Sequence, residues 1–238
     1  MPRAREISDA PAPLIHHLKE LRRRVGIALA AVVVGGIVTF AWCDTLIALL
    51  RTPLNDTPLF FVGVGDAFGI RMQLSLIGGV ALAMPIWLWQ AWAFIRPGLT
   101  DSERRAARPW IPLALLLFVV GVAVAWVVLP FAVSFLLSFA TDDLTPLIAA
   151  DRYFGFVGSL MLVFGLATEY PILLVFLSRV GVVTSAKLRR WRRNALVIAV
   201  IVGAFATPGT DLISPIVLGV VLYLLYELSI WLVRAGGR

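Results

Sequence analysis

The feature that most constrains this chain is a series of apolar runs, each of roughly twenty residues, separated by short segments that hold nearly all the charge. A helix of that length crosses a hydrocarbon core about 30 Å thick. Hydrophobic residues make up 60% of the chain and charged residues 15%, whereas a soluble domain carries about a quarter charged residues. The sequence therefore predicts a polytopic membrane protein and excludes a soluble globular fold.

The apolar runs are long and uniform, which favours helices over the ten-residue alternating strands of a membrane β-barrel. We therefore predict an all-α polytopic membrane protein. Its six transmembrane helices are expected within residues 25–42, 68–94, 110–135, 154–177, 195–206 and 213–233. The first three and last three spans show no internal repeat, which weakens an inverted-repeat transporter architecture.

The lysine and arginine residues divide unequally between the two sets of loops. Eighteen of them lie in the N-terminal segment, in the segments after the second and fourth spans, and in the tail. The opposite loops hold Arg51 and Arg152 against seven aspartates. The positive-inside rule predicts that both termini lie in the cytoplasm. The net charge of +7 is then mainly a topology signal, and we expect no nucleic-acid partner.

An apolar stripe at helical spacing precedes the first span, and it can lie on the membrane or against the bundle. The stripe consists of Leu14, Ile15, Leu18, Leu21 and Val25. We predict a cytoplasmic N-terminal segment with an interfacial helix (1–24), a membrane domain (25–233) and a cytoplasmic tail (234–238).

The fifth span is unusually short. Between Arg193 and Pro208 lie about fourteen residues, which rise roughly 21 Å as a helix and so fall short of the core thickness. The following turn returns at once into the sixth span. Local thinning of the bilayer would relieve this mismatch, and shielding of the hairpin by other helices is an equal alternative.

Several chemistries lack the residues they need. Neither lysine follows the glycine pattern of a P-loop. The two histidines, His16 and His17, are adjacent and outside the spans, so no histidine can activate an intramembrane serine. With a single cysteine, Cys43, a metal site is not expected. We predict no enzyme activity, no cofactor and no metal.

Two acidic residues lie within predicted spans. Glu169 is deep in the fourth span, where a carboxylate costs a few kcal/mol and is expected to face a cavity, a partner or a proton. The alternative is a protonated side chain satisfied by a local hydroxyl such as that of Thr168. Glu227 lies two turns before Arg234, and structural pairing is at least as good an interpretation as function.

Three further carboxylates each have a structural alternative. Asp211 has the place of a helix N-cap before the sixth span. Glu20 has the spacing of an i,i+4 pair with Arg24. Glu103 closes a capping-box pattern that begins at Thr100.

With these residues in hand, the chain resembles the TatC family, the multispanning receptor component of the twin-arginine (Sec-independent) protein translocase. The resemblance rests on residues 17–24 (HLKELRRR), Pro85, 90–99 (QAWAFIRPGL), 103–105 (ERR), 164–165 (FG), 169–171 (EYP), 179–184 (RVGVVT), 207–208 (TP), Asp211 and 225–227 (LYE). It implies six helices, both termini in the cytoplasm, and short fifth and sixth helices.

The resemblance also implies what the protein binds. The family binds the paired arginines of signal peptides on folded cargo. It moves that cargo with single-span partners of the TatA and TatB type, in an oligomeric complex that uses the proton-motive force. Carried onto this chain, Glu20 and Glu103 would hold the two arginines, because a guanidinium fork fits a carboxylate where an ammonium does not. The residues expected to shape that site are Leu21, Arg22, Phe94, Leu99, Arg104 and Arg105.

The predicted transport and partner contacts form a second set: Pro53, Phe68, Glu169, Asp211 and Glu227. The alternative function is a small proton-coupled secondary transporter with Glu169 as its proton carrier.

Overall fold

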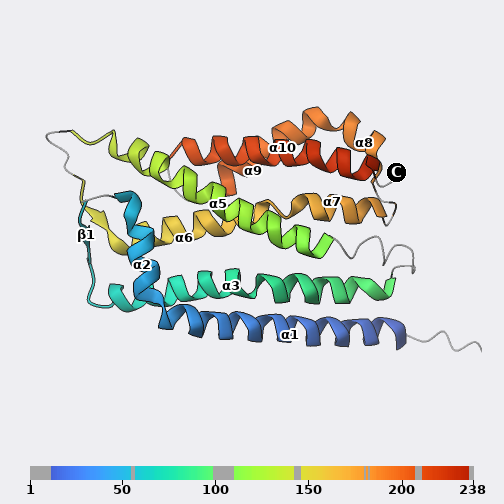
Figure 1. Ribbon diagram of the computed structural model, residues 1–238, viewed down its shortest axis with the longest axis horizontal. Helices are drawn as coiled ribbons and strands as arrows, with labels where there is room; N and C mark the ends of the chain where they lie inside the picture. Colours follow the sequence, from blue (N-terminus) through green and yellow to red (C-terminus); the bar gives the residue numbers. More distant parts are fainter. Residues whose placement is uncertain are drawn as a thin grey trace, which may run out of the picture.

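In the computed structural model the chain is almost entirely helical, and the structure describes residues 12–54, 57–98, 110–141, 146–179, 181, 183–206 and 211–235. The helices are α1 (Ala12–Ala41), α2 (Cys43–Arg51), α3 (Asp66–Ile95), α5 (Trp110–Leu137), α6 (Ala150–Ala167), α7 (Tyr170–Arg179), α8 (Ser185–Arg190), α9 (Arg192–Ala206) and α10 (Ile213–Ala235). The long helices run side by side, with α1 at one edge of the bundle and α8 to α10 at the other (Figure 1).

Five helical segments in the described residues are long and apolar enough to cross a membrane: His17–Ala41, Asp66–Ile95, Trp110–Leu137, Ala150–Ser178 and Ile213–Arg234. The fifth predicted span forms α9, which with 15 residues is shorter than these five. The expectation of a short sixth helix is wrong, since α10 has 23 residues. It is long because the apolar run from Leu212 to Val233 is interrupted by a single charge, Glu227.

Glycines let α1 and α3 cross with their backbones in contact. A Cβ added to Gly35 would lie 2.8 Å from the carbonyl oxygen of Gly79, and one added to Gly79 would lie 2.7 Å from that of Val32. Small residues allow such close helix approach in membranes, where apolar side chains gain little from leaving the lipid. This crossing fixes the relative position of the two helices that carry Glu20 and Gln90.

One end of the bundle carries short elements that the sequence did not predict. Helix α2 follows α1 after a turn at Trp42, and the 3-10 helix η1 (Thr52–Leu54) follows α2. Strand β1 (Leu59–Phe60) pairs in parallel with β2 (Ile148–Ala149), a small exception to the all-α prediction. The buried hydroxyl of Tyr153 donates a 2.8 Å hydrogen bond to the carbonyl of Leu50. These contacts tie the segment after α1 to the start of α6.

The lone cysteine, Cys43, is fully buried at the start of α2. Burial raises the pKa of its thiol, and this effect outweighs the nearby Arg71, which lowers the pKa, while Asp44 raises it further. Since the thiolate is the reactive form, this residue is a packing group rather than a nucleophile.

Candidate functional site

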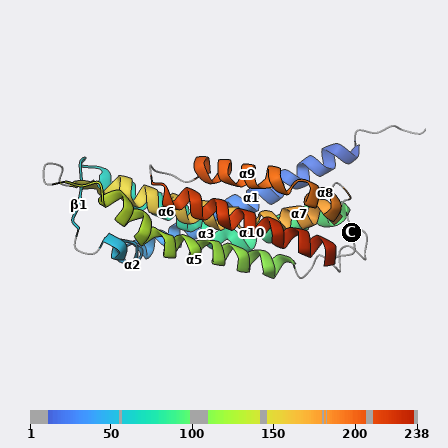
Figure 2. The same ribbon diagram turned by 90° about the horizontal axis from the view of Figure 1, so that it is seen from above.

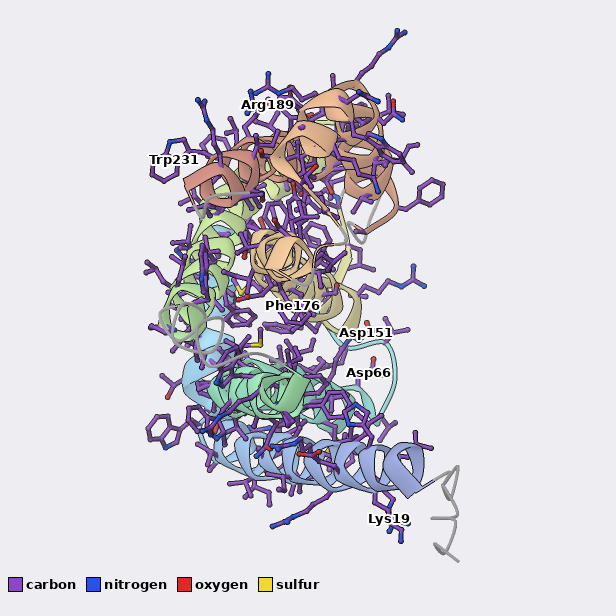
Figure 3. All side chains as sticks on the ribbon, turned by 90° about the vertical axis from the view of Figure 1, so that its right-hand side faces the viewer. Lys19, Asp66, Asp151, Phe176, Arg189 and Trp231 are labelled. Carbon is purple, nitrogen blue, oxygen red and sulfur yellow. The ribbon has the colours of Figure 1, made fainter. Side chains whose placement is uncertain are left out.

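The described basic residues concentrate at one end of the bundle, which we call the basic end. It is formed by the start of α1, the end of α3, the end of α7, helix α8, the start of α9 and the end of α10. Figure 3 looks onto this end, with Lys19 projecting from α1 and Arg189 from α8. The labelled acids Asp66 and Asp151 begin α3 and α6 at the opposite end. The charge asymmetry predicted from the sequence is therefore also an asymmetry of the fold.

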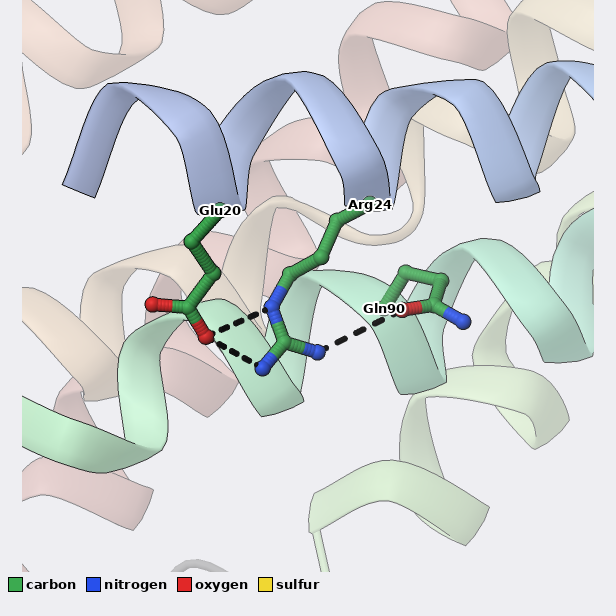
Figure 4. Close-up of polar contacts among 3 residues, drawn as sticks. All are labelled: Glu20, Arg24 and Gln90. Atoms are coloured by element: carbon green, nitrogen blue, oxygen red, sulfur yellow. Dashed lines mark hydrogen bonds and ion pairs between the residues drawn. The ribbon is translucent and has the colours of Figure 1, made fainter. Parts of the chain in front are cut away.

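A polar cluster joins α1 to α3 at the basic end (Figure 4). The Arg24 guanidinium donates through Nε (3.1 Å) and Nη2 (2.5 Å) to one oxygen of Glu20, Oε1. Its Nη1 donates to Oε1 of Gln90 at 3.4 Å. The side chains of Arg24 and Glu20 are 23% and 24% exposed, so the pair is partly withdrawn from water and less screened than a surface pair.

The predicted i,i+4 pairing of Glu20 with Arg24 is thus present, whereas the contact of Gln90 with this pair was not predicted. Gln90 reaches the pair only because α1 and α3 cross closely at their glycines. An amide on the neighbouring helix orients the guanidinium, and so helps fix the Glu20 carboxylate at the helix surface.

Aromatic and apolar side chains flank the cluster. The rings of His17 and Phe94 stack with centroids 4.3 Å apart and planes at 25°. This contact again joins α1 to α3, one turn beyond the polar cluster. Leu21 is 39% exposed and Arg22 is exposed. Glu20, Leu21, Arg22 and Phe94 therefore all belong to one end of the α1–α3 pair.

Four members of the predicted signal-peptide site lie outside the described residues: Leu99, Glu103, Arg104 and Arg105. The described chain ends nearby at η2 (Arg96–Gly98) and resumes at Trp110. Their roles, and the capping interpretation of Glu103, stay predictions.

Glu169 lies at a break in the fourth predicted span. Helix α6 ends at Ala167 and α7 begins at Tyr170. Pro171 has no N–H to offer the carbonyl of Ala167, so the ladder of hydrogen bonds stops there. The N–H of Glu169 instead donates to Leu166, three residues back, at 3.1 Å. The predicted fourth span (154–177) thus lies within one segment long and apolar enough to cross a membrane, Ala150–Ser178, with a short turn inside it.

The hydroxyl of Thr168 does not serve as the donor to Glu169 that the sequence suggested. Thr168 is buried, and its Oγ1 lies 2.8 Å from both the carbonyl of Leu117 on α5 and the carbonyl of Gly165. Its proton is committed to these backbone acceptors. Oε1 of Glu169 is buried and has no hydrogen-bond partner among the described residues. An acceptor in that state is costly at this depth unless something completes it.

Two other predicted residues have structural partners. Asp211 caps α10, because the N–H of Ser214 donates to its Oδ2 at 2.7 Å, which confirms the capping interpretation. Glu227 pairs with Arg192 of α9 at 2.7 Å rather than with Arg234. This pair joins the basic ends of α9 and α10.

The remaining predicted residues lie at the opposite end, far from Glu20. Pro53 is half-buried in η1, and Phe68 is 64% exposed in the first turn of α3. Sequence reasoning missed a contact here, the ion pair of Arg71 on α3 with Asp44 on α2. Arg71 lies inside a predicted span, and a charged residue there indicates that it needs a partner. Among the described residues no group of three potential metal ligands occurs.

Comparisons with known proteins agree on one family. The sequence profile of the Sec-independent protein translocase protein (TatC) matches residues 16–220. The TatC protein of Frankia casuarinae is 36% identical, with 96% of this chain and 67% of that protein covered. The TatC protein of Carboxydothermus hydrogenoformans is 34% identical over 96% of this chain and 95% of that protein. A crystal structure of the twin-arginine translocase receptor TatC is similar at TM-score 0.80 and 34% identity, covering 93% of this chain and 100% of that chain.

Proposed function

The chain belongs to the TatC family of Sec-independent protein translocase proteins, and on that premise we propose that it binds twin-arginine signal peptides at its basic end. The observation that carries the proposal is the guanidinium already held against Glu20 by two hydrogen bonds. A carboxylate that orients one arginine side chain from within the protein has the geometry to receive another.

Glu20 and Glu103 are the two carboxylates that we assign to the arginine pair, with Leu21, Arg22, Phe94, Leu99, Arg104 and Arg105 around them. The basic end as a whole repels a cationic peptide. The arginine pair of the peptide must then be recognised locally, by carboxylates that can each accept two hydrogen bonds from a guanidinium. This favours two specific acidic residues over a diffuse acidic surface.

Peptide binding tests this assignment directly. The purified chain in lipid nanodiscs should bind a labelled twin-arginine peptide and bind a matched lysine-pair peptide weakly. Glu20→Ala and Glu103→Ala should each weaken only the first interaction. Asp151→Ala, which removes an exposed carboxylate at the opposite end, is the control and should bind normally. Wild-type affinity in both glutamate variants would refute the assignment.

We further propose how the chain lies in the membrane. The basic end faces the cytoplasm by the positive-inside rule, with both termini there and with the outer-end residues Pro53 and Phe68 on the other side. The segment 1–24 precedes the membrane domain 25–233, and 234–238 form the tail. Helix α9 is the sixth membrane crossing. Its 15 residues rise roughly 22 Å, so the inner membrane beside it is thinned.

Lengthening α9 tests the mechanical part of this proposal. An added helical turn of leucine and alanine should leave insertion intact and impair cargo export, because the bilayer is no longer thinned. The control replaces four lipid-facing residues of α9 with leucine and alanine at constant length. Normal export by a stably inserted, lengthened variant would show that export does not depend on the short length of α9.

Glu169 is our proposed contact for a single-span partner of the TatA or TatB type, within an oligomeric complex that uses the proton-motive force. Its buried Oε1 has no partner among the described residues, and a polar side chain on a partner helix at matching depth would complete it. A small proton-coupled transporter, the alternative use of Glu169, is not favoured by the comparisons.

A further inference from the structure

An apolar cavity of about 550 Å³ lies between α7, α8, α9 and α10, away from the Glu20 cluster. Helices α8, α9 and α10 occupy the edge of the bundle opposite α1, and α7 lies beside α10 (Figure 1). Seen from above, α9 and α10 run side by side (Figure 2). The walls of the cavity include Tyr170 and Leu174 from α7, Ile198 from α9 and Leu222 from α10. A volume of this size lies in the range of ligand pockets, about 300–1,000 Å³.

The cavity is elongated along the direction of the membrane-crossing helices. Its lining extends from Lys187 and Trp191, at the basic end, to Val202 within α9. Trp191 and Val202 are separated by roughly 16 Å along the helix axis. The cavity therefore runs from the basic end of the molecule along the apolar length of α9.

The walls offer little to a polar ligand. The hydroxyl of Tyr226 already donates to the carbonyl of Leu188 at 2.7 Å. Leu188 and Leu222 are buried, and Ala199 is 6% exposed. The inner part of the cavity is thus suited to a hydrocarbon chain, because burying apolar surface against apolar walls is favourable.

The mouth of the cavity differs from its walls. Lys187 is exposed and is the one charged residue among the described residues of the lining. Arg189, Arg190 and Arg193 are exposed on the same short segment, while Trp191, 49% exposed, has the place of an interfacial aromatic. Basic pockets between membrane helices on the cytoplasmic side bind anionic lipid head groups.

We propose that this cavity holds one acyl chain of an anionic phospholipid, with the lipid phosphate at Lys187. The chain fills the apolar slot along α9, and Trp191 lies at the level of the glycerol backbone. The lipid occupies space that the four helices leave open beside the short α9. Charge complementarity at the mouth selects an anionic lipid over a zwitterionic one.

Native mass spectrometry of the full chain, released from nanodiscs of equal phosphatidylglycerol and phosphatidylcholine, tests the proposal. The wild type should retain phosphatidylglycerol in preference to phosphatidylcholine. Lys187→Gln should reduce that retention about tenfold, more than the roughly fivefold expected for one charge near a membrane surface. Ala195→Leu, which narrows the cavity from α9, should reduce it similarly.

Two matched controls separate a specific site from general attraction. Arg189→Gln removes a charge from the same helix as Lys187, and Ala204→Leu adds the same bulk at an exposed position of α9; neither residue lines the cavity. Arg189→Gln should lose no more than the roughly fivefold expected for one surface charge, and Ala204→Leu should retain lipid as the wild type does. Equal losses in Lys187→Gln and Arg189→Gln would overturn the site in favour of diffuse electrostatics.

Two further results would overturn the assignment of an anionic lipid to this cavity. Equal retention of the two lipids would overturn the assignment of an anionic head group. Unchanged retention in Ala195→Leu, with loss of crosslinking to a single-span partner, would make the cavity a partner site instead. Lys187 is exposed, so its variant is expected to fold, and the comparison with Arg189→Gln stands even if Ala195→Leu does not express.

Discussion

Two glutamates of this protein have opposite surroundings. Glu20 lies near the start of α1, a quarter exposed, with the guanidinium of Arg24 on its Oε1. Glu169 lies at the break between α6 and α7, where its Oε1 is buried without a hydrogen-bond partner among the described residues. The first environment stabilises a negative charge, and the second disfavours one. The same side chain is therefore expected to act as an ion at one site and as a hydrogen-bonding group at the other.

Substitution by glutamine at both positions tests this difference most strongly. Glu20→Gln removes the charge that pairs with arginine, at a cost of about 2 kcal/mol, so twin-arginine peptide affinity should fall about thirtyfold. Glu169→Gln should leave peptide affinity unchanged. Fluorescence anisotropy of a labelled peptide measures both. Normal affinity in Glu20→Gln would show that charge is not what this site uses.

At Glu169 the informative comparison is between glutamine and alanine. Glutamine keeps the hydrogen-bonding groups, so Glu169→Gln should retain crosslinking to the partner helix and much of the transport. Glu169→Ala should weaken partner association about tenfold, as loss of an interhelical hydrogen bond in a membrane costs about 1–2 kcal/mol. If glutamine were as inactive as alanine in transport while crosslinking persisted in both, protonation would be the task of this residue.

Gln90 should have a smaller effect than Glu20, because it acts on the peptide site through Arg24. Gln90→Ala removes the 3.4 Å contact with Nη1 of Arg24. This hydrogen bond has a charged donor but is long, and we expect it to contribute about 1 kcal/mol, so peptide affinity should fall about threefold to fivefold. Addition of salt should reduce binding by the same factor in variant and wild type. A thirtyfold loss would place Gln90 in direct contact with the peptide.

Thr168 should show the smallest functional effect. Thr168→Val removes the hydrogen bond between its hydroxyl and the carbonyl of Leu117, which costs about 0.6 kcal/mol of stability in a membrane protein. Thermal unfolding in detergent measures that loss, and partner crosslinking through Glu169 should be unaffected. A loss of crosslinking equal to that of Glu169→Ala would assign the partner contact to the threonine.

Apolar run length predicted where the five membrane-crossing helices lie, because it decides which segments can cross a bilayer. It did not predict that α1 begins as early as Ala12, and the fifth predicted span forms only the 15-residue α9. The break at Glu169 was not predicted either, although Pro171 marked the place. Pro85 and Pro130 lie within unbroken helices, so a proline by itself does not predict where a helix breaks. Near Pro171 the hydroxyl of Thr168 contacts α5, and Gly121 of α5 leaves no space for a Cβ beside it. Such packing depends on the neighbouring helix and has no local signature.

The polar contacts of the candidate site also fall into a predictable and an unpredictable group. The Glu20–Arg24 pair follows from spacing along one helix, and the Asp211 cap from position before another. Gln90 joins the cluster only through the crossing of α1 and α3, and Arg192 meets Glu227 only because α9 folds back on α10. The β1–β2 pair likewise joins segments that are remote in the chain. Contacts between elements were therefore the part that a single sequence could not supply.

The parallel pairing of β1 with β2 can form only late in the synthesis of this protein. Synthesis proceeds from the N-terminus, so α1, α2 and β1 exist before the ribosome has added β2 and α6. Until then β1 presents an unpaired edge at the end of the bundle opposite the basic end, where another extended chain can join it. The first half of the molecule is thus completed by its second half during biogenesis. A chain truncated before residue 148 would keep the crossing of α1 and α3 but would lack the strand that pairs with β1.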